Sequence, residues 1–236
     1  AYILHSRPYR DSSVILEVFT VEQGRLSLVG KGARRRARGG SNAALLQPFI
    51  PLLLSFSGRS EMKTLTQVES AGRVPTLKGE RLFSGLYVNE LLMRLLHRHD
   101  PHPALFAAYS EVLGDLSSAD SVDAALRRFE FRLLDDLGYS FDLGADARTG
   151  ELVQDEAWYH YHPDLGMVQL EGVADPGQPA YAGRDLMMLS RGEFAGDARL
   201  AAKRLARQAL AGHLGEAPLK SRDLFRSYRT QTGETE

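Results

Sequence analysis

The strongest chemical signal in the chain is a basic run embedded among glycines. Five positive charges fall within eight residues, and four glycines flank or interrupt them. The charged residues are Lys31, Arg34, Arg35, Arg36 and Arg38. Because like charges this close together repel one another in a packed element, we expect a loop here. Its natural counter-ion is the phosphate backbone of a nucleic acid.

Basic and aromatic residues near the N-terminus extend this signal. Arg7 and Arg10 add cations that can follow a phosphate backbone, and the rings of Tyr9 and Phe19 are surfaces on which bases could stack. The alternative is that both rings belong to an ordinary hydrophobic core. The predicted DNA-binding residues are Arg7, Tyr9, Arg10, Lys31, Arg34, Arg35, Arg36 and Arg38.

The net charge of −1 conceals two oppositely charged parts. Residues 1–78 hold 12 basic and 5 acidic side chains, a balance of +7, whereas residues 79–236 hold 17 basic and 25 acidic ones, a balance of −8. This asymmetry is typical of a module that binds polyanions joined to an acidic body.

Other kinds of chemistry lack their usual residue patterns. The chain has no cysteine, which excludes disulfides, thiolate zinc sites and cysteine nucleophiles. The segment Gly24–Gly32 departs from a phosphate-binding loop in its glycine spacing and in the residue that follows the lysine. The histidines His97, His99 and His102 do not have the spacing of metal ligands. We therefore predict a protein that is not an enzyme, with no catalytic, cofactor-binding or metal-binding residues.

The pattern of apolar residues argues against a membrane protein. The longest apolar run, Ile50–Leu54, is too short to span a bilayer and is interrupted by Pro51. Nothing at the N-terminus resembles a secretion signal, and the lack of cysteine fits a reducing compartment. We expect a cytoplasmic protein that associates with the nucleoid.

The elements that must position the basic residues are predicted to be strands. Ser13–Thr20 and Arg25–Gly30 are rich in apolar and β-branched residues and are joined by a short loop that suits a hairpin. Apolar residues alternate from Ile50 to Phe56, although Pro51 favours an edge or a bulge there. With Met62–Ser70 and a first strand near Arg7, about five strands precede residue 78, as in a small barrel of the OB type.

From Gly79 the apolar spacing becomes helical, and three helices are predicted before a small β insertion around residues 150–172. Two more helices follow, and the last residues, Gln231–Glu236, are expected to fray. The predicted fold is therefore α+β, with an OB-type domain over 1–78 and a helical domain over 79–236. The predicted helices run from Gly79 to before Asp100, over Pro103–Leu116, from Asp120 or Ser121 to Gly138, over Gly196–Leu214 and over Pro218–Tyr228.

Three blocks of sequence resemble one family, the bacterial recombination-repair protein RecO. Their order and spacing carry the resemblance, which extends from the first residue to about residue 228. The blocks are Ala1–Ser13 with Phe19-Thr20, Gly24 and Gly30–Arg34; Phe129-Glu130 with Leu133-Leu134 and Leu137–Tyr139; and Leu219–Arg222 with Leu224-Phe225.

The resemblance implies a mediator of DNA repair and recombination after DNA damage, without enzymatic turnover. Such a protein binds single- and double-stranded DNA, anneals complementary strands and, with its partner RecR, helps RecA replace the single-strand binding protein SSB. Many relatives carry a four-cysteine zinc motif after the Leu-Gly-Tyr block. The corresponding stretch here, Ser140–Leu170, has no cysteine, so we expect the β insertion to stand without metal.

The family also implies a site for the acidic, phenylalanine-ended tail of SSB. Such a ligand needs an apolar hole beside arginines that can hold a carboxylate. Two arginines and two apolar residues of the third helix meet this description, namely Arg128, Phe129, Arg132 and Leu133. A second basic stripe, formed by Arg199, Lys203 and Arg207, is the other candidate, and for either group a plain solvated helix face is the alternative.

A different class of function is also compatible with the residues. The barrel could dock an acidic segment of another protein, so that the chain serves as an interaction adaptor and contact with DNA is incidental. Binding of an oligonucleotide in the absence of any other protein separates this reading from the first.

Overall fold

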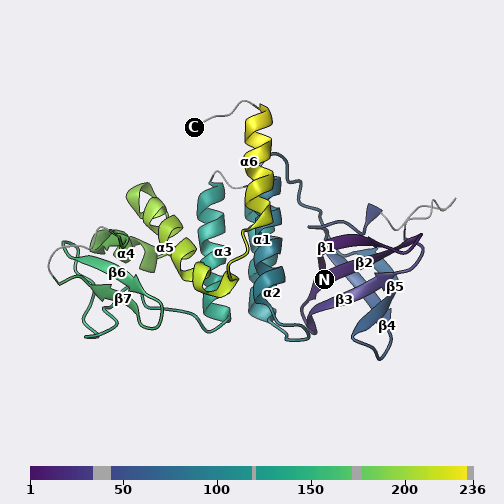
Figure 1. Ribbon diagram of the computed structural model, residues 1–236, viewed down its shortest axis with the longest axis horizontal. Coiled ribbons are helices and arrows are strands. Elements are labelled where there is room, and N and C mark those ends of the chain that lie inside the picture. The colour runs from purple at the N-terminus through teal and green to yellow at the C-terminus, as the bar shows by residue number, and fades with distance from the viewer. Residues whose placement is uncertain (34–43, 119–120, 172–176, 233–236) are drawn as a thin grey trace. The chain divides into compact units, whose positions relative to one another are not determined.

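The computed structural model describes residues 1–33, 44–118, 121–171 and 177–232. Within these ranges the chain forms five strands, three helices, three further strands and three further helices, in that order (Figure 1). A β-rich N-terminal part is thus followed by a mostly helical part with a small extra sheet. The predicted α+β class is confirmed.

Residue contacts divide the chain into two compact units. The first, which we call the sheet unit, comprises Ala1–Ser118 and Pro218–Glu236. The second, the inserted unit, comprises Ala119–Ala217. The predicted domain boundary between residues 78 and 79 instead follows the change from strands to helices, and as a domain boundary it stays a prediction.

The five-stranded sheet has the order β1-β2-β3-β5-β4, and only the β3–β5 pair is parallel. Its apolar residues, including Ile3, Leu16 and Leu28, pack into one buried cluster. Ala1 and Leu52 exchange two backbone hydrogen bonds of 2.8 Å, so the outer strands approach each other at this residue pair. Closure into a full barrel stays a prediction. The strands are β1 (Tyr2–Tyr9), β2 (Ser13–Thr20), β3 (Gly24–Gly30), β4 (Leu52–Ser57) and β5 (Met62–Ser70).

The turn between β2 and β3 packs tightly against the segment that follows α1 (Glu80–Leu95). Gly24, the first residue of β3 after this turn, has a φ of 62°, and a Cβ atom there would lie 1.9 Å from the carbonyl oxygen of Asp100. Only glycine satisfies both constraints. One residue later, the N–H of His99 donates to the carbonyl oxygen of Arg25 over 2.9 Å. The hairpin and this segment are therefore held in contact by the backbone itself.

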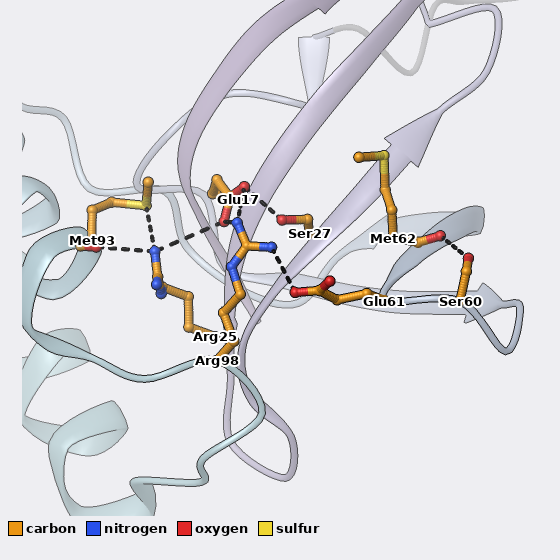
Figure 2. A network of polar contacts seen from close by, with 8 residues as sticks. All are labelled: Glu17, Arg25, Ser27, Ser60, Glu61, Met62, Met93 and Arg98. Carbon is orange, nitrogen blue, oxygen red and sulfur yellow. Dashed lines mark hydrogen bonds and ion pairs between the residues drawn. The ribbon is translucent and has the colours of Figure 1, made fainter.

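A buried carboxylate joins the same parts of the sheet unit (Figure 2). Glu17 on β2 accepts hydrogen bonds from the hydroxyl of Ser27 over 2.6 Å and from the guanidinium of Arg98 over 3.1 Å. Arg25 lies 4.0 Å from Glu17 and donates to the carbonyl oxygen of Met93 over 3.0 Å. The two arginines thus link strands β2 and β3 to the end of α1 and the segment beyond it.

The other helices of the sheet unit are α2 (Pro103–Ser118) and α6 (Lys220–Thr232), and α6 lies beside α1 (Figure 1). The ring of Phe83 on α1 packs against Phe225 on α6. The carboxylate of Glu90 accepts hydrogen bonds from the backbone N–H groups of Lys220 and Ser221, at 3.0 and 2.9 Å. Because unpaired N–H groups open every helix, Glu90 stabilises the start of α6 as well as its position.

The inserted unit packs helices around a small sheet of order β7-β6-β8. The hydroxyl of Ser121, one of the two residues predicted to begin the first of these helices, caps that helix by accepting from the N–H of Ala124. Strand β8 and helix α4 were not predicted, whereas α5 has the predicted bounds. The elements are α3 (Val122–Asp136), β6 (Trp158–His162), β7 (Gly166–Gln169), β8 (Ala180–Ala182), α4 (Gly183–Ser190) and α5 (Gly196–Leu214).

Two expectations for the chain end and for membranes can be compared with the structure. Helix α6 continues through Thr232, so the prediction of fraying from Gln231 is wrong for its first two residues, and 233–236 lie outside the described residues. Within the ranges given above, no helix combines the length and the apolar character that crossing a bilayer requires.

Candidate nucleic-acid interface

Strand register brings several predicted DNA-binding residues to one end of the five-stranded sheet. Tyr9 at the end of β1 pairs with Ser13 at the start of β2, and Val14 pairs with Gly30 at the end of β3. Arg10 follows directly after β1 and Lys31 directly after β3. Both cations therefore lie at the same end of the sheet, on either side of the start of β2.

The side chains at this end are accessible. Arg7, Arg10 and Lys31 are exposed, and Tyr9 is half-buried. Arg10 has a φ of 51° in the turn that joins β1 to β2, and its guanidinium lies 5.1 Å from the centre of the Tyr9 ring. A cation over an aromatic face is attracted by the ring's quadrupole. The turn thus holds a positive charge at the end of the sheet.

In the sequence, the rest of the predicted basic loop follows Lys31. Lys31 is the last of its charges that can be placed. The other four, Arg34, Arg35, Arg36 and Arg38, lie outside the described residues.

One candidate ring proves to be internal, and two further arginines near it are held by a carboxylate. Phe19, considered as a surface for base stacking, is fully buried, with its ring centre 5.4 Å from that of Phe106. Arg25 is largely buried beside Glu17, and desolvation by burial lowers its pKa. Arg98 also reaches Glu17 and contacts Glu61 over 3.6 Å. These residues tie the sheet to the end of α1 and the segment beyond it, whereas Arg10 and Lys31 lie at the other end of β2.

The two structural units carry opposite net charges. The residues of the sheet unit include 19 basic and 13 acidic side chains, a balance of +6, and those of the inserted unit include 10 basic and 17 acidic ones, a balance of −7. The exposed cations described above therefore belong to a unit whose overall charge also favours a polyanion.

The predicted site for an acidic tail is only partly accessible. Arg128 and Arg132 are exposed and lie one turn apart on α3. Phe129 and Leu133 are 2% and 0% exposed, because the apolar stripe of α3 forms part of the core. In this structure the two apolar residues therefore do not line an open hole beside the arginines.

The second basic stripe lies on α5. Arg199 and Lys203 both approach the carboxylate of Asp123, at 3.6 and 3.7 Å. Arg207, one turn beyond Lys203, lines a cavity of the inserted unit. Apolar residues also line that cavity, so this stripe combines cations with an accessible apolar surface.

The stretch expected to replace a zinc motif is organised by one carboxylate. Asp146 is 3% exposed and accepts hydrogen bonds from the backbone N–H groups of Arg148, Thr149 and Gln169. Burial alone would raise the pKa of Asp146, but these hydrogen bonds outweigh it and the pKa lies below its ordinary value. The residues present do not fit a thiolate zinc site because the chain has no cysteine.

The histidines of two described segments lie near one another in sequence but do not form a metal site. His97 and His99 are exposed at the end of α1, and His160 and His162 share a face of β6 with Trp158. Among the residues whose placement is known, no three histidine or acidic side chains come together as a possible metal site.

The fold and the basic end of the sheet define an α+β protein with a positively charged strand-rich unit and an acidic helical unit, a combination suited to work on nucleic acid. Comparison with known proteins identifies the family. Residues 1–73 match the family model "Recombination protein O N terminal", and residues 77–223 match "Recombination protein O C terminal".

The similarity to individual proteins extends over almost the whole chain. A DNA repair protein RecO of Methylococcus capsulatus is 45% identical over 228 residues, which are 96% of this chain and 92% of the relative. Relatives with the same description from Nitrosococcus oceani and Pseudomonas aeruginosa are 46% and 44% identical, over 97% and 95% of this chain and 92% of each relative. The chain belongs to the RecO family of DNA repair proteins.

Proposed function

We propose that the chain is a recombination-repair mediator that binds single- and double-stranded DNA and anneals complementary strands. With RecR, it promotes the loading of RecA on DNA covered by SSB. The chain does this by binding and requires no enzymatic turnover. Its place of action is the nucleoid in the cytoplasm.

The observation that carries the proposal is the collection of cations at one end of the sheet. Arg10 and Lys31 are brought together by strand register, and Arg7 and Tyr9 are on the adjoining strand. The sequence continues from Lys31 into the basic run of Arg34, Arg35, Arg36 and Arg38. Contacts of this kind neutralise phosphates without reading bases, which leaves the bases of two strands free to pair.

Salt dependence of binding tests the proposed DNA site. Each phosphate contact to a single strand contributes about −0.7 to the slope of log affinity against log salt. Replacing Arg10 and Lys31 with alanine is expected to flatten the slope by about 1.4, and replacing Arg34, Arg35 and Arg36 by about 2. The measurement is fluorescence anisotropy of a labelled oligonucleotide over a range of salt concentrations.

Arg59 provides a matched control for this experiment. It is an exposed arginine in the turn between β4 and β5, so Arg59→Ala removes the same charge elsewhere on the sheet unit. An unchanged slope in the test variants would remove these residues from the site. A wild-type chain that binds no oligonucleotide without another protein would favour the interaction adaptor instead.

A second part of the proposal is that the acidic tail of SSB binds through Arg128 and Arg132. The two side chains are exposed one turn apart, a spacing that lets both reach one carboxylate-rich segment. A tail peptide is expected to bind the Arg128→Ala/Arg132→Ala variant more weakly than the wild type in an anisotropy titration. The variant Arg199→Ala/Lys203→Ala is the matched pair on α5. A loss confined to the α5 variant would move the tail site to that helix.

A further inference from the structure

The inserted unit contains an open cavity of about 720 Å³ with an exposed tryptophan on its wall. The side chain belongs to Trp158, the only tryptophan of the chain, and is 53% exposed. Leu200 on α5 also lines the cavity and is 53% exposed. Two large apolar side chains thus face solvent on the wall of one cavity.

Strand geometry explains the exposure of the indole. Along β6, Tyr159 and Tyr161 are buried, so the alternation of the strand turns Trp158 outward. The residue paired with Trp158 across the sheet is Ala182, whose methyl group covers little of a large ring. The ring is therefore held by a rigid strand while much of its surface remains free for a ligand.

Four cations line the same cavity, one from α4 and three from α5. The cavity is lined by Arg184, Lys203, Arg204 and Arg207 but only by two acidic residues, within a unit whose balance is −7. Arg204 packs over the ring of Tyr181 at 5.5 Å, which fixes its direction. In the part of the chain that the structure describes, Arg207 has no hydrogen-bond or ion-pair partner for its side chain.

The spacing of two of these cations suits a chain of phosphates. Lys203, which also contacts Asp123 over 3.7 Å, and Arg207 are four residues apart on α5, about 6 Å along the helix axis. Successive phosphates of an extended strand have comparable separations. An aromatic face beside such cations matches the general pattern of single-strand binding, in which bases stack on rings and the backbone follows positive charge.

We propose that this cavity binds a short stretch of single-stranded nucleic acid, with a base stacked on Trp158 against Leu200 and phosphates at Lys203 and Arg207. The inference rests on the proposed function, and it adds a second contact on the inserted unit to the one on the sheet unit. A chain with two separate contacts can hold two strands, or two parts of one strand, at a high effective concentration.

The single tryptophan allows a direct test on the full chain. An oligothymidylate is titrated into the wild type while tryptophan emission is recorded, and a labelled copy of the same oligonucleotide is followed by anisotropy. Stacking of a base on Trp158 is expected to quench the emission. Arg207→Ala should flatten the salt slope of the quenching midpoint by about 0.7, the contribution of one phosphate contact. Arg148→Ala, an exposed arginine of the same unit outside the cavity, should leave that slope unchanged.

The outcomes separate this inference from the proposed function. Anisotropy that reports binding while the tryptophan emission stays constant would overturn the second contact and leave the proposed function standing. If neither signal changes, both fail. Quenching by an acidic peptide ending in phenylalanine, but not by the oligonucleotide, would assign the cavity to a peptide and overturn the inference. The sheet-unit contact can be removed by Arg10→Ala/Lys31→Ala. In that variant, the additional change Trp158→Ala should weaken oligonucleotide binding about tenfold.

Discussion

Removing the charge of Glu17 should loosen the contact between the β2–β3 hairpin and the end of α1. Glu17 is 8% exposed and accepts from Ser27 and Arg98 over 2.6 and 3.1 Å, with Arg25 at 4.0 Å (Figure 2). In Glu17→Gln the amide can still accept from Ser27, so the volume and one hydrogen bond are kept. Two guanidinium groups are then left beside each other without their shared anion.

The expected loss can be worked out from burial. Removing one partner of a buried ion pair costs about 3–5 kcal/mol, because the other charge stays desolvated. The side chain of Arg98 is 39% exposed and therefore partly screened by solvent. We expect a loss near the lower limit, about 3 kcal/mol in the free energy of unfolding, or roughly 6–12 °C in melting temperature for a chain of this size.

Urea denaturation followed by circular dichroism measures this loss, and Glu61→Gln is the matched control. Glu61 also contacts Arg98, but its side chain is 74% exposed, so its replacement should cost less than about 1 kcal/mol. The amide of His99, which donates to Arg25, should exchange with solvent faster in Glu17→Gln only. Equal losses in the two variants would refute the view that the buried charge holds this contact.

Acid, helix docking and helix capping offer further measurements. The pKa of Asp146 in the folded protein is lowered because the hydrogen bonds that it accepts outweigh burial. Its contribution to the stability of the fold is therefore complete above the ordinary carboxyl pKa of about 3.9. That contribution is lost as the pH falls through and below this value. An acid titration of Asp146→Asn followed by circular dichroism should lack this component. Glu90→Gln weakens the contacts at the start of α6 and should cost about 2 kcal/mol, with faster proteolysis of that helix. Ser121→Ala should cost about 1 kcal/mol in a thermal melt, whereas the exposed Ser117, replaced by alanine, should cost much less.

Most elements were predictable from the sequence, including the strands of the small β insertion, whereas strand β8 and helix α4 were not. Strand β2 has the predicted bounds because it is a run of apolar and β-branched residues, and β5 and α5 also have the predicted bounds. Helix α4 has only eight residues and begins at Gly183, where a Cβ atom would lie 1.8 Å from the carbonyl oxygen of Gln154. The position of α4 therefore depends on a contact between Gly183 and Gln154, two residues that are distant in the sequence. No local spacing reports such a contact.

The candidate sites show the same limit. The residue types at Arg10 and Lys31 were recognised from the sequence, but their meeting at one end of the sheet depends on strand register. For the predicted tail site, Leu133 belongs to the apolar spacing that also predicts a core-facing stripe. A stripe that packs into a core does not at the same time line an open hole, and Phe129 is buried for the same reason. The exposed face of Trp158 was not predicted, because it depends on the pairing of this residue with the small Ala182 on strand β8.

The charge division is insensitive to where the two parts of the chain are separated. Cutting the sequence at residue 78 gives balances of +7 and −8, and grouping residues by contact gives +6 and −7. The second grouping moves the acidic residues of α1 and α2 into the sheet unit, but it also brings in the basic helix α6 from the end of the chain. A polyanion would therefore be attracted to the sheet unit as a whole, and the register of β1, β2 and β3 decides where on that unit the charge is most accessible. Against this background, the cations around Trp158 are a local exception within the acidic unit, which is why their contribution must be measured at the tryptophan itself.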